Sequence, residues 1–100
     1  MTMDPRFTFR NIDSTDGLKS HTLAKLTKLD KHIQKPVGMH VVFNVEHLDH
    51  IVEITLAANG NQYIVSNKSD NMYVSIDGAI NKLQSQLKKD RDRIKKHKGE

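Results

Sequence analysis

The residues of this sequence best suited to chemistry are cations that repeat at helical spacing near the C-terminal end. One set recurs at intervals of four, three, four and three residues: Lys82, Gln86, Lys89, Arg93 and Lys96. At about 100° per residue these positions form a single ridge on a helix. A second ridge on the same helix consists of Lys88, Arg91 and Lys95. Clustered cations of this kind bind the phosphates of a polyanion by releasing counterions, although cations at a helix end also complement the helix dipole.

The distribution of charge along the chain favours binding of a polyanion over a mere complement to the helix dipole. The formal net charge is +4. Residues 1–81 hold eight Lys and Arg against nine Asp and Glu, a net charge of −1, whereas residues 82–100 hold eight against three, a net charge of +5. All of the excess positive charge therefore lies in the last fifth of the chain, which indicates a polyanionic partner.

A further set of basic side chains falls on one face of the first predicted helix: His21, Lys25, Lys28 and His32. If the two helices lie side by side, their ridges can join into one electropositive groove. A rigid set of cations in such a groove recognises the shape of a folded RNA through its closely spaced phosphates. The candidate RNA-binding residues are Lys25, Lys28, Lys82, Gln86, Lys89, Arg91, Arg93 and Lys96.

The composition argues against several other classes of protein. The chain has no cysteine, which excludes disulfides and thiolate chemistry and suits the cytoplasm. His47 and His50 flank Asp49 without completing a four-ligand metal site. No nucleophile elbow or glycine-rich phosphate loop is present, and no apolar run approaches the roughly 18 residues of a membrane span. We expect no enzymatic activity, no cofactor, no small-molecule substrate and no contact with a membrane.

Hydrophobic periodicity predicts the elements that position these cations. Strands are predicted at residues 6–12, 39–46, 51–58 and 62–66, and helices at residues 16–33 and from Asp70 or Asn71 onward. Asn59-Gly60 is typical of a two-residue hairpin turn. The order β-α-β-β-β-α predicts an α+β fold with a four-stranded, mainly antiparallel sheet and two helices packed on one face, as in double-stranded-RNA-binding domains. We expect one domain over residues 1–100, with a basic helix end at 82–98.

Two residues of the second helix call for an explanation. Gly78 lies in the helix interior, where glycine costs about 1 kcal/mol relative to alanine, so we expect close packing of that turn against the first helix or the sheet. Tyr73 borders the apolar stripe, which favours a place in the core over base stacking.

The second helix also carries a recognisable motif. The segment from Asn71-Met72-Tyr73 through Ala79-Ile80 to Lys82-Leu83 and Gln86-Leu87-Lys88-Lys89 closely resembles the ribosome hibernation factors, a family that includes the hibernation promoting factor and the ribosome-associated inhibitor called protein Y. The segment Ala24-Lys25-Leu26 with Lys28-Leu29, the Asn-Gly hairpin and the element order extend the resemblance over nearly the whole chain.

The resemblance implies a function in translation. Such proteins bind the rRNA of the small ribosomal subunit between head and body, overlap the A and P sites, and exclude messenger and transfer RNA. It also implies that basic residues of this chain contact rRNA: Lys25, Lys28, Lys82, Lys89, Arg91 and Arg93. Within the family the chain is similar to the short form, which acts in stationary phase or stress and pairs ribosomes together with ribosome modulation factor.

The chain departs from the family pattern at Ser85, where arginine is usual, and at Asn71, where aspartate is usual. The first change removes an expected phosphate contact, and the second keeps a good helix cap. Two alternatives stay open on the sequence alone. One is a generic module that binds structured RNA, and the other is a protein-interaction domain of the kind proposed for sigma-factor modulation.

Overall fold

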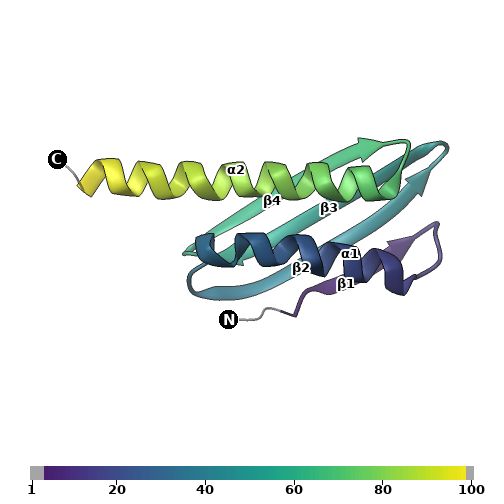
Figure 1. Ribbon diagram of the computed structural model, residues 1–100, viewed down its shortest axis with the longest axis horizontal. Coiled ribbons are helices and arrows are strands. Elements are labelled where there is room, and N and C mark those ends of the chain that lie inside the picture. The colour runs from purple at the N-terminus through teal and green to yellow at the C-terminus, as the bar shows by residue number, and fades with distance from the viewer. Residues whose placement is uncertain (1–3, 99–100) are drawn as a thin grey trace.

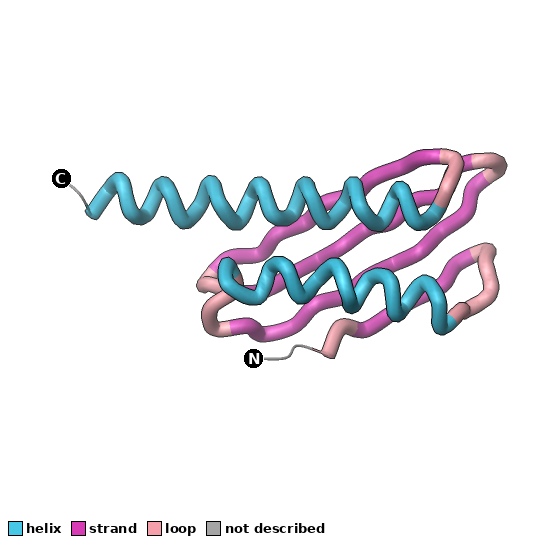
Figure 2. Tube along the Cα trace, viewed as in Figure 1, coloured by secondary structure: helices cyan, strands magenta, loops and turns pink. Residues whose placement is uncertain are grey.

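The computed structural model describes the backbone of residues 4–98 and the side chains of residues 4–90. The elements are, in order, β1 (Arg6–Arg10), α1 (Asp16–Leu26), the 3-10 helix η1 (Thr27–His32), β2 (Pro36–Glu46), β3 (Asp49–Ala58), β4 (Asn61–Ser69) and α2 (Met72–Lys98). The predicted order β-α-β-β-β-α is confirmed, with η1 as an addition after the first helix (Figures 1 and 2).

The four strands form one sheet in the order β1-β2-β3-β4. β1 pairs with β2 in parallel, while the β2–β3 and β3–β4 pairs are antiparallel. The sheet is thus mainly antiparallel, as predicted, and the single parallel pair follows from the helical crossover between β1 and β2. Both helices lie on one face of the sheet, with α2 against β3 and β4 and α1 beside it (Figure 1).

The core lies between this face and the helices. Alternate residues of the central strands are completely buried, among them Val41 and Phe43 on β2 and Ile54 and Leu56 on β3. The helices contribute Leu18, Leu29, Ile76, Leu83 and Leu87, none more than 4% exposed. Burial of these mostly aliphatic side chains is the main force that fixes both helices on the sheet.

Local polar contacts set the ends of the helices. The Thr15 hydroxyl accepts a hydrogen bond from the Leu18 amide at 3.1 Å and caps α1. The Asn71 side chain accepts from the Tyr73 amide at 2.8 Å, so of the two predicted caps of α2 it is Asn71 that does so. Each cap satisfies an amide that the first turn of a helix leaves without a backbone partner.

The first helix ends earlier than predicted. It is α-helical only to Leu26, and the remaining turns wind as η1. The end of η1 is held by the β3–β4 turn, because Asn59 donates to the His32 carbonyl at 3.1 Å and accepts from the Gln34 amide at 2.6 Å. Asn59 and Gly60 both have positive φ angles, of 57° and 76°, as the predicted hairpin turn requires.

Gly78 packs against the sheet. A Cβ atom at this position would clash with the side-chain amide of Asn67 on β4. The glycine therefore allows α2 to approach β4 closely, which confirms the predicted role of Gly78.

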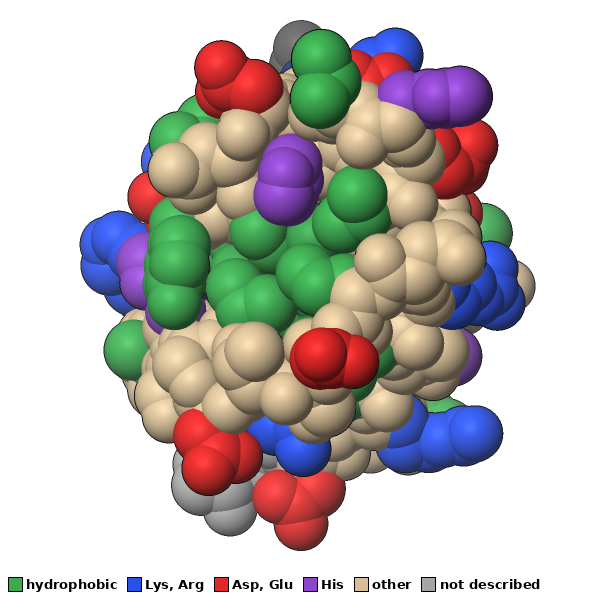
Figure 3. Space-filling model, turned by 90° about the vertical axis from the view of Figure 1, so that its right-hand side faces the viewer, with side chains coloured by type: hydrophobic (Ala, Val, Ile, Leu, Met, Phe, Trp, Pro, Cys, Tyr) green, Lys and Arg blue, Asp and Glu red, His purple; other side chains and the backbone are tan. Residues whose placement is uncertain are grey.

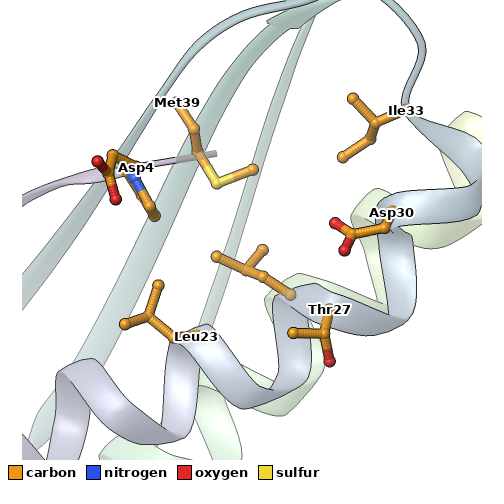
Figure 4. Close-up of a pocket in the computed structure, with 8 residues that line it drawn as sticks. Asp4, Leu23, Thr27, Asp30, Ile33 and Met39 are labelled. Atoms are coloured by element: carbon orange, nitrogen blue, oxygen red, sulfur yellow. The ribbon is translucent and has the colours of Figure 1, made fainter. Parts of the chain in front are cut away.

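One apolar pocket, of about 240 Å³, lies beside α1 (Figure 4). Its lining side chains come from the N-terminal segment, α1, η1, β2 and Ile33 just after η1, and its apolar members include Leu23, Leu26 and Met39. No helix within the described residues is long and apolar enough to cross a membrane.

Candidate nucleic-acid interface

The predicted ridge on α2 faces the edge of the sheet. The Lys82 ammonium group donates a hydrogen bond to the Ser66 carbonyl oxygen of β4 at 2.7 Å. Gln86 and Lys89, four and seven positions further on, share this side of the helix and are exposed. We call the side of α2 that carries Lys82, Gln86 and Lys89 the outer flank.

The opposite side of α2 faces α1. The Asp77 carboxylate lies 2.8 Å from His21 Nε2 and 4.0 Å from Lys25 Nζ, both on α1. Asp77 and Lys82 are five positions apart, which is about 140° around a helix. Lys88, eleven positions after Asp77, returns to the same side. We call the side that carries Asp77 and Lys88 the inner flank.

This arrangement corrects the prediction of one merged groove. Lys25 faces α2, but Lys82, Gln86 and Lys89 lie on the far flank of that helix. The reason is geometric: the two ridges of α2 border its buried stripe on either side, so only one of them can face α1. The structure therefore brings Lys25 toward the inner flank and leaves the outer flank as a separate basic surface.

The basic face of the first helix is also shorter than predicted. Lys25 is half-buried and Lys28, on η1, is exposed. His32, by contrast, is only 9% exposed and belongs to the interior. The chain changes from 3.6 to 3.0 residues per turn at Thr27, and this change rotates the later positions away from the face that ideal α-helical spacing predicts.

Tyr73 was expected in the core, and this expectation was wrong. The side chain is 45% exposed. Its ring meets the His21 ring edge-on, with the centroids 5.0 Å apart. We call His21, Lys25, Tyr73 and Asp77 the interhelical cluster. Spacing along α2 placed Tyr73 near the stripe but gave no sign that α1 would supply its partner.

The end of α2 extends beyond the sheet (Figure 1). Its last side-chain contacts with β4 within the described residues are made by Asp90, which accepts hydrogen bonds from the Tyr63 hydroxyl at 2.7 Å and from Asn61 at 3.5 Å. Asn61 is the first residue of β4. The backbone of residues 91–98 continues as helix for about 12 Å past this point. We call residues 91–98 the arm.

The arm carries much of the basic sequence. Five of its residues are cationic: Arg91, Arg93, Lys95, Lys96 and Lys98. The side chains of the predicted site residues Arg91, Arg93 and Lys96 lie outside the part of the structure that is described. Seen from the opposite end of the molecule, apolar side chains gather at the centre and Lys and Arg lie toward the margins, so that end is not a basic surface (Figure 3).

The described lysines of η1 and of the two flanks of α2 are not neutralised by carboxylates. Among the described residues, Lys28, Lys82, Lys88 and Lys89 form no ion pair, and all four are exposed. Lys25 is the exception because of its contact with Asp77. Unpaired exposed cations keep the full electrostatic attraction for phosphates that internal salt bridges would weaken.

Comparison with known proteins identifies the family. The family model described as "Sigma 54 modulation protein / S30EA ribosomal protein" matches residues 6–95. The chain belongs to this family. The protein named ribosome hibernation promoting factor of Escherichia coli strain K12 is 35% identical to it over 95 residues, which cover 95% of this chain and 100% of that protein.

Further members of the family agree in sequence and in structure. The ribosome hibernation promoting factor of Pseudomonas putida strain KT2440 is 31% identical over 84% of this chain and 82% of its own length. The N-terminal domain of protein Y from Thermus thermophilus superposes with a TM-score of 0.78 at 25% identity, covering 87% of this chain and 98% of that domain. A ribosomal subunit interface protein from Coxiella burnetii gives 0.77 at 26% identity, covering 87% and 96%.

Proposed function

We propose that this protein is a ribosome hibernation factor that binds the rRNA of the small ribosomal subunit between head and body. There it occupies the region of the A and P sites and excludes messenger and transfer RNA by steric occlusion. It acts in the cytoplasm, in stationary phase or under stress, and it performs no catalysis.

The observation that carries this proposal is a full-length match to proteins named ribosome hibernation promoting factor, combined with a basic helix that extends beyond the sheet. The match covers all of the relative from Escherichia coli, so the shared region is the whole of that protein. The candidate rRNA contacts are Lys25, Lys28, Lys82, Gln86, Lys89, Arg91, Arg93 and Lys96.

The two flanks of α2 support a site enclosed by RNA. Lys82 on the outer flank and Lys88 on the inner flank are six positions apart, which is about 120° around the helix, so RNA on both sides of α2 allows both to contact phosphates at the same time. A channel between two rRNA domains offers two such walls, whereas the surface of a single duplex offers one. Affinity then comes from cation–phosphate contacts, and inhibition comes from the volume that the domain fills.

The relatives' names also suggest a role beyond inactivation. Proteins named for promoting hibernation are expected to favour pairing of inactive ribosomes, and we propose ribosome modulation factor as the second protein in that process. Sedimentation of ribosomes with this protein, with and without ribosome modulation factor, distinguishes pairing from simple inactivation by the appearance of ribosome dimers.

The description of the family also mentions modulation of sigma 54, and this favours a protein-interaction domain as the second candidate function. In that case the basic flanks would be incidental, and any binding to ribosomes would be weak and nearly independent of salt. A generic RNA-binding module would bind any RNA duplex as tightly as it binds ribosomes.

Sucrose-gradient cosedimentation with small ribosomal subunits tests the proposal. K82E/K89E reverses two exposed cations of the outer flank and should abolish cosedimentation with an unchanged circular dichroism spectrum. R6E/R10E is the matched control, because it makes the same change in charge at exposed positions on the sheet face away from the helices. Equal loss in both variants, or normal binding of K82E/K89E, contradicts the assignment of the outer flank.

A further inference from the structure

The interhelical cluster contains a carboxylate where an RNA-binding surface should avoid one. Asp77 lies on the inner flank of α2, among His21, Lys25 and, further along the helix, Lys88. Its side chain is 44% exposed, so its charge is not buried away from a ligand. A carboxylate at such a place repels phosphates and by itself weakens the binding of RNA.

The contacts of Asp77 with α1 suggest a structural contribution to binding that offsets this repulsion. His21 Nε2 lies 2.8 Å from the carboxylate, and Lys25 Nζ approaches the same oxygen at 4.0 Å. Both residues come from α1, one helical turn apart, so a single carboxylate of α2 holds two consecutive cation-capable side chains of the neighbouring helix.

A second contact fixes the ring of His21. Tyr73, one turn before Asp77 on α2, meets that ring edge-on at a centroid distance of 5.0 Å. The Tyr73 hydroxyl reaches over Gly17 at the start of α1, where a Cβ atom would lie only 3.0 Å from it. The imidazole is therefore constrained by a carboxylate and by an aromatic ring, both from α2.

We infer that Asp77 is a positioning residue for RNA binding: it orders His21 and Lys25 of α1 so that they face the same phosphates as the inner flank of α2. This inference rests on the proposed function. Lysine side chains lose much conformational freedom when a ligand immobilises them, and a protein that orders them beforehand reduces this loss at the moment of binding. We expect the repulsion between one carboxylate and the phosphates to weaken binding by less than this ordering strengthens it.

D77N separates the repulsion of phosphates by the carboxylate from the ordering of His21 and Lys25, because loss of the repulsion strengthens RNA binding and loss of the ordering weakens it. It preserves the size of the side chain and removes one negative charge. If charge alone mattered, D77N would bind every RNA more tightly. We expect instead that D77N binds small ribosomal subunits roughly fivefold to tenfold more weakly, while its affinity for unstructured poly(U) stays equal or increases.

D30N is the matched control. Asp30 is exposed on η1, and its substitution changes the net charge by the same amount without touching the interhelical cluster. D30N should bind both small subunits and poly(U) slightly more tightly. NMR of the His21 ring gives a readout that does not depend on RNA: its cross-peak should move toward the position found in the unfolded chain in D77N and stay in place in D30N.

The same substitution in a variant without His21 and Lys25 should change the affinity for small subunits in the opposite direction. In H21Q/K25Q there is nothing left for Asp77 to position, so adding D77N should now strengthen binding to small subunits. Tighter binding of D77N in the wild-type background, or equal effects in both backgrounds, overturns the inference. Failure of the wild-type protein to bind small subunits would instead overturn the proposed function, so the two failures are distinguishable.

Discussion

Tyr63 links the sheet to the base of the basic arm. Its side chain is buried, and its hydroxyl donates to Asp90 at 2.7 Å. Burial, and then the hydrogen bond to the Asp90 carboxylate, raise the pKa of Tyr63 above its ordinary value of 10.0. The native protein thus holds the phenolic proton more tightly than the unfolded chain does.

The contribution of Tyr63 to the free energy of unfolding should decrease at high pH. A group whose pKa is raised on folding contributes stability below its unfolded pKa and loses it as the pH rises through the native pKa. Y63F should cost about 1–2 kcal/mol at neutral pH because it removes a hydrogen bond to a charged group. This difference should shrink as the pH rises above about 10.

Urea unfolding of both proteins at a series of pH values between about 8 and 11 measures this difference. The difference in unfolding free energy between wild type and Y63F isolates the contribution of the Tyr63 hydroxyl. Two stability curves that stay parallel through this range would show that the Tyr63 hydroxyl does not contribute as the structure indicates.

Individual residues differed in how well the sequence predicted them. Asn71 and Gly78 were predicted correctly because a cap and a close approach depend on local backbone geometry and on the size of one residue. The exposure of Tyr73 and the burial of His32 were predicted wrongly, because the burial of both side chains depends on where α1 lies relative to α2. Periodicity places a residue on a face of its own element and says nothing about the neighbouring one.

At the scale of elements, α2 consists of two parts with different surroundings. Up to Asp90 it closes the core against β3 and β4, and from residue 91 onward its backbone continues as the arm. The buried stripe of the first part extends through Leu83 and Leu87. The arm should therefore contribute little to folding, and its cations should contribute mainly to binding.

Replacement of the arm's cations tests this division. The five substitutions R91Q, R93Q, K95Q, K96Q and K98Q retain good helix formers, so we expect an unchanged helical spectrum and a melting temperature within about 3 °C of wild type. Affinity for small subunits should fall by roughly tenfold or more at moderate salt. A truncation after Asp90 should show a similar melting temperature and a similar loss of affinity, with a helical signal lower only by the contribution of residues 91–98. A large loss of stability in either variant would contradict the division.

The elements themselves were largely predictable. Alternation in β2 and β3 and the stripes on both helices require one buried face each, and this requirement determines the layers. The change from α1 to η1 was not predictable in this way. It is tied to Asn59, a residue of the β3–β4 turn that contacts His32 and Gln34 across the fold. Such a contact between distant segments leaves no periodic signal in either of them.

At the scale of the whole molecule, the cations form two surfaces, and this has a measurable consequence. Lys82 and Lys89 lie on the outer flank of α2, whereas Lys25 is on α1 and faces the inner flank of α2, and Lys28 follows it on η1. A channel lined by rRNA on both sides can engage both surfaces at once. A single RNA duplex can engage only one of them in a given orientation.

The salt dependence of binding distinguishes these geometries. Each phosphate contact contributes roughly −0.9 to the slope of log K against log salt on a B-DNA duplex, and we apply the same value to rRNA helices. If the seven cationic site residues all contact rRNA, the slope on small subunits should be about −6. The neutral variants K82Q/K89Q and K25Q/K28Q should each reduce its magnitude by about 2, and the two reductions should add.

On an isolated RNA duplex the same variants should behave differently. Only the flank that faces the duplex contributes, so the wild-type slope should be about half as steep, and only one of the two double variants should change it. Fluorescence titrations of the wild type and of each variant, all labelled at the same position, give these slopes at salt concentrations between about 50 and 200 mM. Equal slopes on subunits and duplex would indicate a one-sided contact, and the protein would then be a general RNA-binding module and not one shaped for a channel.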